Sequence, residues 1–470
     1  MTEAALDLAD IQGNVLRGFG YPRVRHFALG VGDAAAARQF LSGLLPGAGG
    51  SCPQVTTAAH WREKPRYTLN AGFTWQGFEA LGVPQQVLAA FPVAFQQGPA
   101  VRAGAPDPDY ADGVGLGDSG DSAPEKWILG GTTTATVHAL ISLYTRSGDA
   151  LEHASSDLRS AFADHGVTEI SHHEGAALPH GGVHFGYRDG ISQPNIAGAP
   201  GRRLADMQPE AGTGDFLLGR DHVNTYGGNY LGGLPNALGD NATYGAFRIL
   251  RQDVAGFEAM LDRYAQEARM DRELVAAKLM GRWRNGVPLT LSPDTPEPAT
   301  PIPPAHLDRF DYAPGADHPA WYDDAQGLRC PVGAHIRRLN PRGAMAMGKP
   351  HSRRLVRRGV AYGPPYDPAQ PDEAERGLLG YFICGDLEMQ YEFIQRAWVN
   401  QDIAMHGLRG TREPILGLQP DTGGRFTIRT TDARDPIVLG GLPTLTYTRG
   451  SAYCLLPGVG GLRYLAGLQP

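Results

Sequence analysis

Four times along the chain, an apolar stretch leads through a short turn into a segment with the apolar spacing of a helix. The stretches are rich in Val, Ile, Leu, Phe and Tyr, and the segments after the turns place apolar residues at about i, i+3, i+4 and i+7. This pattern predicts strands at residues 25–31, 136–145, 244–250 and 378–385. Each turn carries an aspartate in the position of a helix N-cap, namely Asp33, Asp149, Asp253 and Asp386.

The four units predict an α+β fold with an internal duplication. Two units precede residue 200 and two follow it, the number expected for two ferredoxin-like domains with antiparallel sheets. Four strand–helix pairs also occur in other α/β proteins, so the pattern by itself leaves the duplication undecided. We predict an N-terminal domain at residues 1–200 and a C-terminal domain at residues 201–470.

The most proline-dense stretch lies in the second half of the chain. Residues 287–304, VPLTLSPDTPEPATPIPP, follow a helix predicted at residues 271–283. Proline fixes the backbone in extended conformations and removes a hydrogen-bond donor. We therefore expect an exposed, extended excursion that decorates the second domain.

The length and the charge of the chain exclude some classes of protein. A chain of 470 residues exceeds the size at which a single hydrophobic core stops growing. The net charge of −7 offers no basic footprint for nucleic acid, and no apolar run approaches the ~20 residues that cross a bilayer. The N-terminal residues lack the basic and apolar regions of a secretory signal. We expect a cytoplasmic protein without nucleic-acid or membrane partners.

Cysteine usage excludes several kinds of site. The sequence contains no CxxC and no CxxCH, so it indicates neither a zinc knuckle, nor a thioredoxin-like redox pair, nor covalent attachment of haem. Any haem would be held without bonds to cysteine. The four widely spaced cysteines are Cys52, Cys330, Cys384 and Cys454.

The first chemical constellation is a glycine- and histidine-rich stretch at residues 171–196. It contains a GxxDG pattern that begins at Gly186 and places Asp189 before Gly190. Two glycines let the backbone turn sharply and approach a flat ligand, while one carboxylate projects from the turn. Alternatively, His180 and His184 together with Asp189 match the two-His-one-carboxylate set of non-haem iron sites.

The second constellation is CPVGAHIRRLNPR at residues 330–342. Small residues before His335 leave space for a bulky planar group over the imidazole. Arg337, Arg338 and Arg342 supply cations suited to carboxylates such as haem propionates.

The third constellation is the arginine-rich stretch at residues 351–368. If residues 353–358 form a strand, Arg357 shares one face with Arg353, and the other face carries Arg354 and Arg358. Periodicity does not decide which face is inside.

Together these stretches resemble the dye-decolorizing peroxidase family. The GxxDG at residues 186–190 resembles its distal motif, residues 330–342 its proximal-histidine motif, and RRGVAYG at 357–363 the segment of its distal arginine. Further likenesses at residues 9–20, 376–400 and 453–467 extend the resemblance over almost the whole chain, in the manner of the larger fungal and actinobacterial forms. The resemblance implies two ferredoxin-like domains with the haem pocket in the second.

The family also implies a cofactor and its ligands. One non-covalent haem b per chain would be held by His335 on the iron, with its other ring N–H donated to Glu392, or to Glu388 one turn earlier. Further contacts to the haem are expected from the backbone at Gly186 and Gly190 and from the side chains of Arg337 and Arg342.

The same resemblance assigns the distal chemistry. Asp189 would move a proton between the two oxygens of hydrogen peroxide, and Arg357 would keep it ionised and stabilise developing negative charge. Arg354 and Arg358 are the alternatives if the register is shifted. An aspartate-based relay predicts activity that favours acidic conditions.

The implied activity is peroxide-dependent, one-electron oxidation of aromatic compounds and dyes. A rival interpretation is a haem-binding or iron-releasing, deferrochelatase-like protein with incidental peroxidase activity. Whether the chain forms a homo-oligomer is left open by the sequence.

Overall fold

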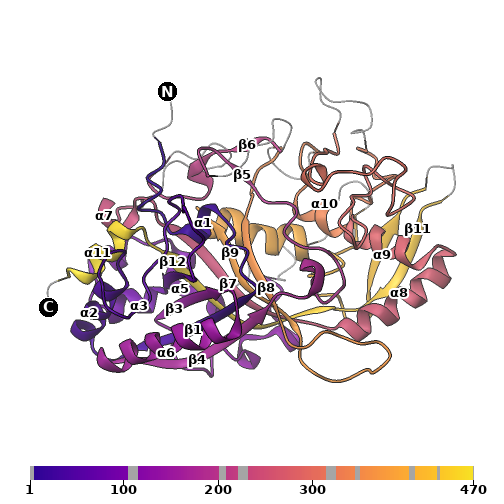
Figure 1. The fold of residues 1–470 in the computed structure, drawn as a ribbon. Helices are drawn as coiled ribbons and strands as arrows, with labels where there is room; N and C mark the ends of the chain where they lie inside the picture. The colour runs from indigo at the N-terminus through magenta and orange to yellow at the C-terminus, as the bar shows by residue number, and fades with distance from the viewer. Residues whose placement is uncertain are drawn as a thin grey trace.

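A single antiparallel sheet of eight strands runs through the described part of the molecule (Figure 1). Its strand order is β4-β1-β3-β2-β12-β7-β9-β8. The structure is a computed structural model, and it describes residues 5–103, 115–200, 208–220, 231–313, 324–344, 350–401, 408–430 and 435–468.

The first half of the sheet has ferredoxin-like topology. Its strands stand in the order β4-β1-β3-β2, and one helix follows the first strand and another the third, as in a βαββαβ unit. The elements are β1 (Arg23–Val31), α2 (Ala34–Leu44), β2 (Tyr67–Phe73), β3 (Ala139–Thr145), α6 (Gly148–Asp164) and β4 (Val167–Ala176).

The second half repeats this order, and the two halves join where β12 pairs with β2. Its elements are β7 (Thr243–Gln252), α8 (Val254–Ala268), β8 (Val356–Tyr362), β9 (Gly377–Cys384), the π-type helices η7 (Leu387–Glu392) and η8 (Ile394–Asn400), and β12 (Thr446–Leu456). The predicted duplicated α+β fold is therefore confirmed. The division at residue 200 stays a prediction.

Shorter elements decorate this frame. The helices are α1 (Gly13–Leu16), α3 (Trp75–Ala80), α4 (Gln85–Leu88), α5 (Val93–Arg102), α7 (Asn236–Gly239), α9 (Arg272–Met280), α10 (His335–Leu339) and α11 (Val459–Ala466). Two small sheets are formed by β5 (Asn195–Ile196) with β6 (Glu210–Ala211), and by β10 (Gly424–Ile428) with β11 (Ile437–Leu442). Single 3-10 turns occur at Gly120–Ser122, Pro124–Lys126, Pro179–Gly181, Thr213–Asp215 and Pro304–His306. Among the described residues, no helix combines the length and the apolarity needed to cross a membrane.

Three of the four predicted aspartate caps are confirmed. Asp33, Asp253 and Asp386 each accept a hydrogen bond from the backbone N–H three residues later. The prediction for Asp149 is wrong, because α6 already begins at Gly148, and its N-cap is Ser147, whose side chain accepts a hydrogen bond from the backbone N–H of Ala150. Asp149 instead lies in the first turn, where its charge favours the positive end of the helix dipole.

The prediction for the proline-rich stretch is only partly right. Leu289 and Thr290 are fully buried, and the backbone N–H of Leu289 donates to Gly281. Residues 287–292 therefore belong to a core under α9, and the exposed part of the excursion begins after them. At the start of the stretch, burial of the apolar residues determines the structure more than the prolines do.

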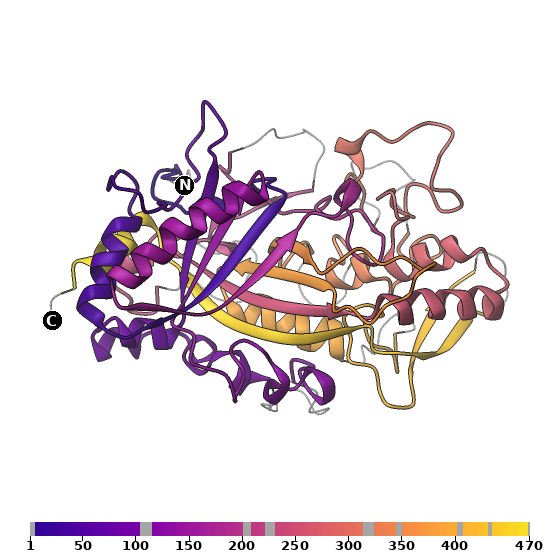
Figure 2. The ribbon, with the colours of Figure 1, turned by 60° about the horizontal axis from the view of Figure 1, so that its bottom comes forward.

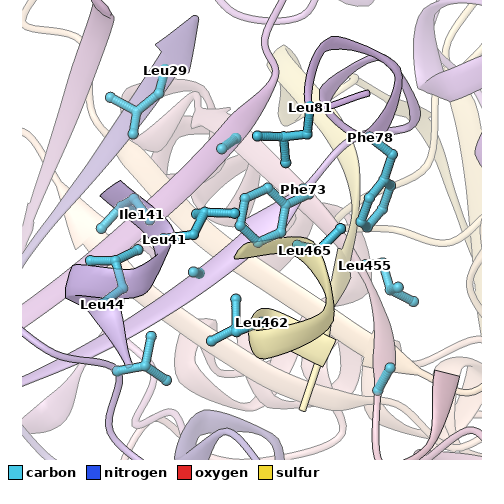
Figure 3. Close-up of a cluster of buried hydrophobic side chains, with 14 of the residues drawn as sticks. Leu29, Leu41, Leu44, Phe73, Phe78, Leu81, Ile141, Leu455, Leu462 and Leu465 are labelled. Carbon is cyan, nitrogen blue, oxygen red and sulfur yellow. The ribbon is translucent and has the colours of Figure 1, made fainter. Parts of the chain in front are cut away.

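The largest hydrophobic cluster lies between the sheet and the helices of the first half (Figure 3). The C-terminal helix α11 inserts Leu462 and Leu465 next to Phe73 of β2 and Leu44 of α2. The last element of the chain thus seals the core of the first half. Figure 2 shows how strongly the sheet twists. Its two edge strands, β4 and β8, approach each other so closely that a Cβ at Gly175 would lie 3.0 Å from the carbonyl oxygen of Ala361.

A buried histidine in this sheet is expected to make the folded state less stable at acidic pH. His26 of β1 is fully buried, and its Nδ1 lies 2.8 Å from the Ser142 hydroxyl. Burial lowers the pKa of His26 to about 3, below the ordinary value of 6.5, so the unfolded chain binds a proton before the folded one does. The stability from the neutral ring is intact above pH 6.5 and is lost as the pH falls toward 3, by about 1.4 kcal/mol per pH unit.

We expect His26→Gln to remove this dependence, because glutamine does not titrate. Between pH 7 and pH 4.5 the wild type should lose roughly 2–3 kcal/mol more stability than the variant, as measured by denaturant unfolding. Equal losses in the two proteins would contradict the assignment.

Candidate active site

A predominantly apolar cavity of about 260 Å³ lies in the second half of the molecule. Its walls are formed by strands β7, β8 and β9, by helices α9, α10, η7 and η8, and by the loop at residues 183–192. Asp189, His335, Arg342 and Arg357 all line it. Residues from three separate motifs of the sequence therefore meet at one cavity.

His335 is the first residue of α10 and faces this cavity with its position fixed by a buried carboxylate. Its Nδ1 lies 3.0 Å from Glu413 Oε1, and Glu413 is fully buried. Glu413 also accepts hydrogen bonds from the backbone N–H groups of Ile415 and Leu416, so both of its oxygens act as acceptors. The proton of the neutral imidazole is therefore assigned to Nδ1, which leaves Nε2 with a lone pair for a metal.

The prediction that Glu392 orients His335 is wrong. Glu392 is fully buried on η7, where it pairs with Arg102 at 2.5 Å and Arg396 at 2.7 Å and accepts from the Tyr453 hydroxyl at 3.0 Å. The alternative, Glu388, also pairs with Arg102, at 3.1 Å. The true partner stands 78 residues after His335 in an irregular segment, where neither periodicity nor a motif of the sequence indicated it.

Asp189 and Arg357 face each other at the solvent-facing part of the cavity. Arg357 Nη2 lies 3.7 Å from Asp189 Oδ1, and the side chains are 41% and 46% exposed. Gln193 ties their segments together, because it accepts from the backbone N–H of Arg357 at 3.1 Å and donates to its carbonyl at 3.2 Å. Gln193, four residues after Asp189, thus joins the loop of Asp189 to the backbone of β8 at Arg357.

The register of the arginine-rich strand is settled by contacts on its two faces. Arg357 lines the cavity, whereas Arg358 Nε donates to the carbonyl of Asn14 at 2.6 Å on the other face. Arg354, which precedes the strand, lines the cavity too. Burial and the neighbouring Arg342 and Arg357 lower the pKa of Arg354 to about 10, and no described residue accepts a hydrogen bond from its guanidinium.

Arg337 and Arg342 serve the walls of the site in different ways. Arg337 donates to Asp324 at 3.2 Å and to the carbonyl of Cys330 at 2.8 Å, and it is not among the described residues that line the cavity. Its role is to hold the loop before His335. Arg342 lines the cavity and pairs with Asp308 at 2.5 Å, which fixes the direction of its guanidinium.

The two glycines of GxxDG shape the loop. Gly186 has φ +83°, and a Cβ there would meet the guanidinium of Arg284 at 2.3 Å. Gly190 has φ +76°, which disfavours other residues. Neither glycine is among the described residues that line the cavity, so their predicted contact with a cofactor has no support there.

The alternative iron site of His180, His184 and Asp189 also lacks support. His184 is buried and turned away from the cavity, with Nε2 2.7 Å from the carbonyl of Tyr362. The described residues contain no group of three or more side chains suited to a metal ion, and the side chain of His180 lies outside them.

Comparisons with known proteins show which proteins the whole chain is similar to. No family model matches the chain. A dye-decolorizing peroxidase of Mycena epipterygia is 27% identical over 437 residues, which cover 89% of this chain and 76% of the relative. The multifunctional dye peroxidase DyP2 of Amycolatopsis sp. is 28% identical over 505 residues, which cover 98% of this chain and 97% of the relative.

Solved structures show the same likeness in three dimensions. A dye-decolorizing peroxidase in complex with 2,6-dimethoxyphenol is 26% identical, has a TM-score of 0.78 and is matched over 98% of this chain and 100% of that one. The chain is a homologue of the dye-decolorizing peroxidases. Its relatives include fungal and actinobacterial members of that family, and its α+β fold matches the solved structure over the whole of that chain.

Proposed function

We propose that this dye-decolorizing peroxidase homologue is a haem peroxidase that uses hydrogen peroxide to oxidise aromatic compounds and dyes in one-electron steps. The observation that carries the proposal is the meeting of His335, backed by Glu413, with Asp189 and Arg357 at one cavity. The activity agrees with the names of the relatives, which are peroxidases of dyes.

The residues of the cavity fit a haem. A histidine with one nitrogen held by a carboxylate is a usual axial ligand of haem iron, and the surrounding side chains are mostly apolar. Arg342 and Arg354 supply cations for the two propionates. No cysteine is among the described residues that line the cavity, in keeping with one non-covalent haem b per chain.

Bound haem would supply the iron that accepts electrons from the reductant and passes them to peroxide. Asp189 accepts the proton from one peroxide oxygen and returns it to the other, so that water leaves. Arg357, 3.7 Å away from Asp189, stabilises the negative charge that develops on the departing oxygen. Glu413 holds the Nδ1 proton of His335 and thereby strengthens Nε2 as a donor.

The proposed role of Glu413 gives a prediction that separates it from Glu392. Glu413→Gln removes the negative charge behind His335 and should raise the reduction potential of the bound iron while slowing the reaction with peroxide about 10- to 100-fold. Glu392→Gln is the matched control, because it removes an equally buried carboxylate that does not contact His335. Spectroelectrochemical titration of both variants should show a shift for Glu413→Gln alone, and equal potentials would refute the role.

One experiment tests the function as a whole. Haem-loaded protein supplied with hydrogen peroxide and an anthraquinone dye should bleach the dye over many turnovers, and the bleaching should require both haem and peroxide. Release of metal-free porphyrin without dye turnover would contradict the proposal and favour the iron-releasing interpretation.

A further inference from the structure

A second hollow lies on the outer side of the GxxDG loop. It has a volume of about 630 Å³ and is bounded by the loop after β4, the turn after α9 and the loop after β8. Val183 and Arg188 line both this groove and the cavity. The wall between the two hollows is therefore one layer of side chains thick, and we call the outer hollow the loop groove.

The loop groove carries positive charge in an acidic protein. Arg188 and Arg284 line it, and no carboxylate occurs among its described lining residues, although the net charge of the chain is −7. His184 also lines it, but burial and the nearby Arg376 lower the pKa of that imidazole, so the ring is neutral. Because Glu273 and Glu258 balance the charge of Arg284, the positive charge that favours an anion in the groove is that of Arg188.

Arg188 is the cation available to a ligand. Arg284 is engaged, because it pairs with Glu273 at 2.8 Å and Glu258 at 3.2 Å and donates to the carbonyl of Phe185. Arg188 is exposed, and no described residue forms an ion pair with it. Its backbone is fixed, since its N–H donates to the carbonyl of Arg284 at 2.9 Å and it forms a β-bridge with Gly182.

The remaining lining offers flat apolar surface. Tyr366 lines the groove together with Leu178, Pro179 and Pro365. The guanidinium of Arg376 lies 5.3 Å from the centre of the Tyr366 ring, which holds the tyrosine in place. An aromatic ring can pack against this surface while a charged substituent reaches Arg188.

We propose that the loop groove binds aromatic reductants that carry a carboxylate or sulfonate, with the anion at Arg188 and the ring against Tyr366. The site is separate from the opening at Asp189 and Arg357, and it lies one side-chain layer from the cavity. The inference rests on the proposed peroxidase function for its purpose, but binding itself requires no peroxide.

The test uses two ligands that differ by one charge, 4-hydroxy-3,5-dimethoxybenzoate and neutral 2,6-dimethoxyphenol. Their dissociation constants are measured by calorimetry on haem-loaded protein without peroxide, so failure of the peroxide chemistry would not affect the result. Arg188→Gln should weaken binding of the benzoate about fivefold, the size of one exposed ion pair, and change binding of the phenol less than twofold. Arg62→Gln removes an exposed arginine far along the chain and should change neither constant.

Two further variants keep the proposal open to refutation. Tyr366→Leu should weaken both ligands, because each loses the same ring contact. If Arg357→Gln weakens the benzoate while Arg188→Gln does not, the anion binds at the opening of the cavity and the proposal is overturned. Equal effects of Arg188→Gln and Arg62→Gln would overturn it as well.

Discussion

Replacing His335 by alanine is expected to abolish the Soret band of haem-loaded protein or to weaken haem binding at least about 100-fold. The reason is that His335 contributes the only imidazole among the described residues that line the cavity, and its Nδ1 is already engaged by Glu413. Absorption titration with haem measures the effect. His153→Ala is the matched control, because that histidine is 86% exposed on α6 and should leave the spectrum unchanged.

A second variant guards against a folding defect in the first. His335→Gly leaves a gap that free imidazole can enter, so added imidazole should restore the Soret band. A band that is retained and unshifted in His335→Ala would remove His335 from the role of axial ligand.

Changing Asp189 to asparagine is expected to slow the reaction with hydrogen peroxide by about 100-fold or more while haem stays bound. Asparagine keeps the shape of the side chain but does not accept a proton. Arg357→Leu should slow the same step by roughly 100- to 1000-fold, because the guanidinium 3.7 Å from Asp189 no longer stabilises the developing charge. Stopped-flow absorption of the haem band on mixing with peroxide measures both rates.

Asp294→Asn provides the control for the distal variants, since that carboxylate is exposed and does not line the cavity. Its rate with peroxide should equal that of the wild type. If the Asp189 and Arg357 variants also react at the wild-type rate, another group transfers the proton and the distal assignment fails.

The parts of the site that could be predicted are the residues that stand in short, recognisable sequence motifs. Asp189 stands in a glycine turn, His335 follows small residues and Arg357 lies in an arginine-rich stretch, and the resemblance to the dye-decolorizing peroxidases then assigned a role to each of them. The structure brings these three residues to one cavity. Strand and helix periodicity predicted the four strand–helix units, and the resemblance to the family favoured their grouping into two ferredoxin-like halves.

The parts that the sequence did not predict depend on contacts between distant segments. Glu413 reaches His335 from an irregular segment, and nothing in its neighbourhood marks it as a partner. Arg337 looked like a ligand for propionates because charge alone does not show that Asp324 and a carbonyl already engage it. The joining of the two halves into one sheet through β2 and β12 is also a long-range pairing, which periodicity does not report.

The central claim is that one haem lies between His335 and the pair formed by Asp189 and Arg357. A crystal structure of haem-loaded protein with cyanide tests it most directly. The account predicts Nε2 of His335 on the iron and cyanide on the opposite side of the porphyrin, within hydrogen-bond reach of Asp189 or Arg357. Iron held by any other residue, or cyanide bound away from both distal side chains, would contradict it.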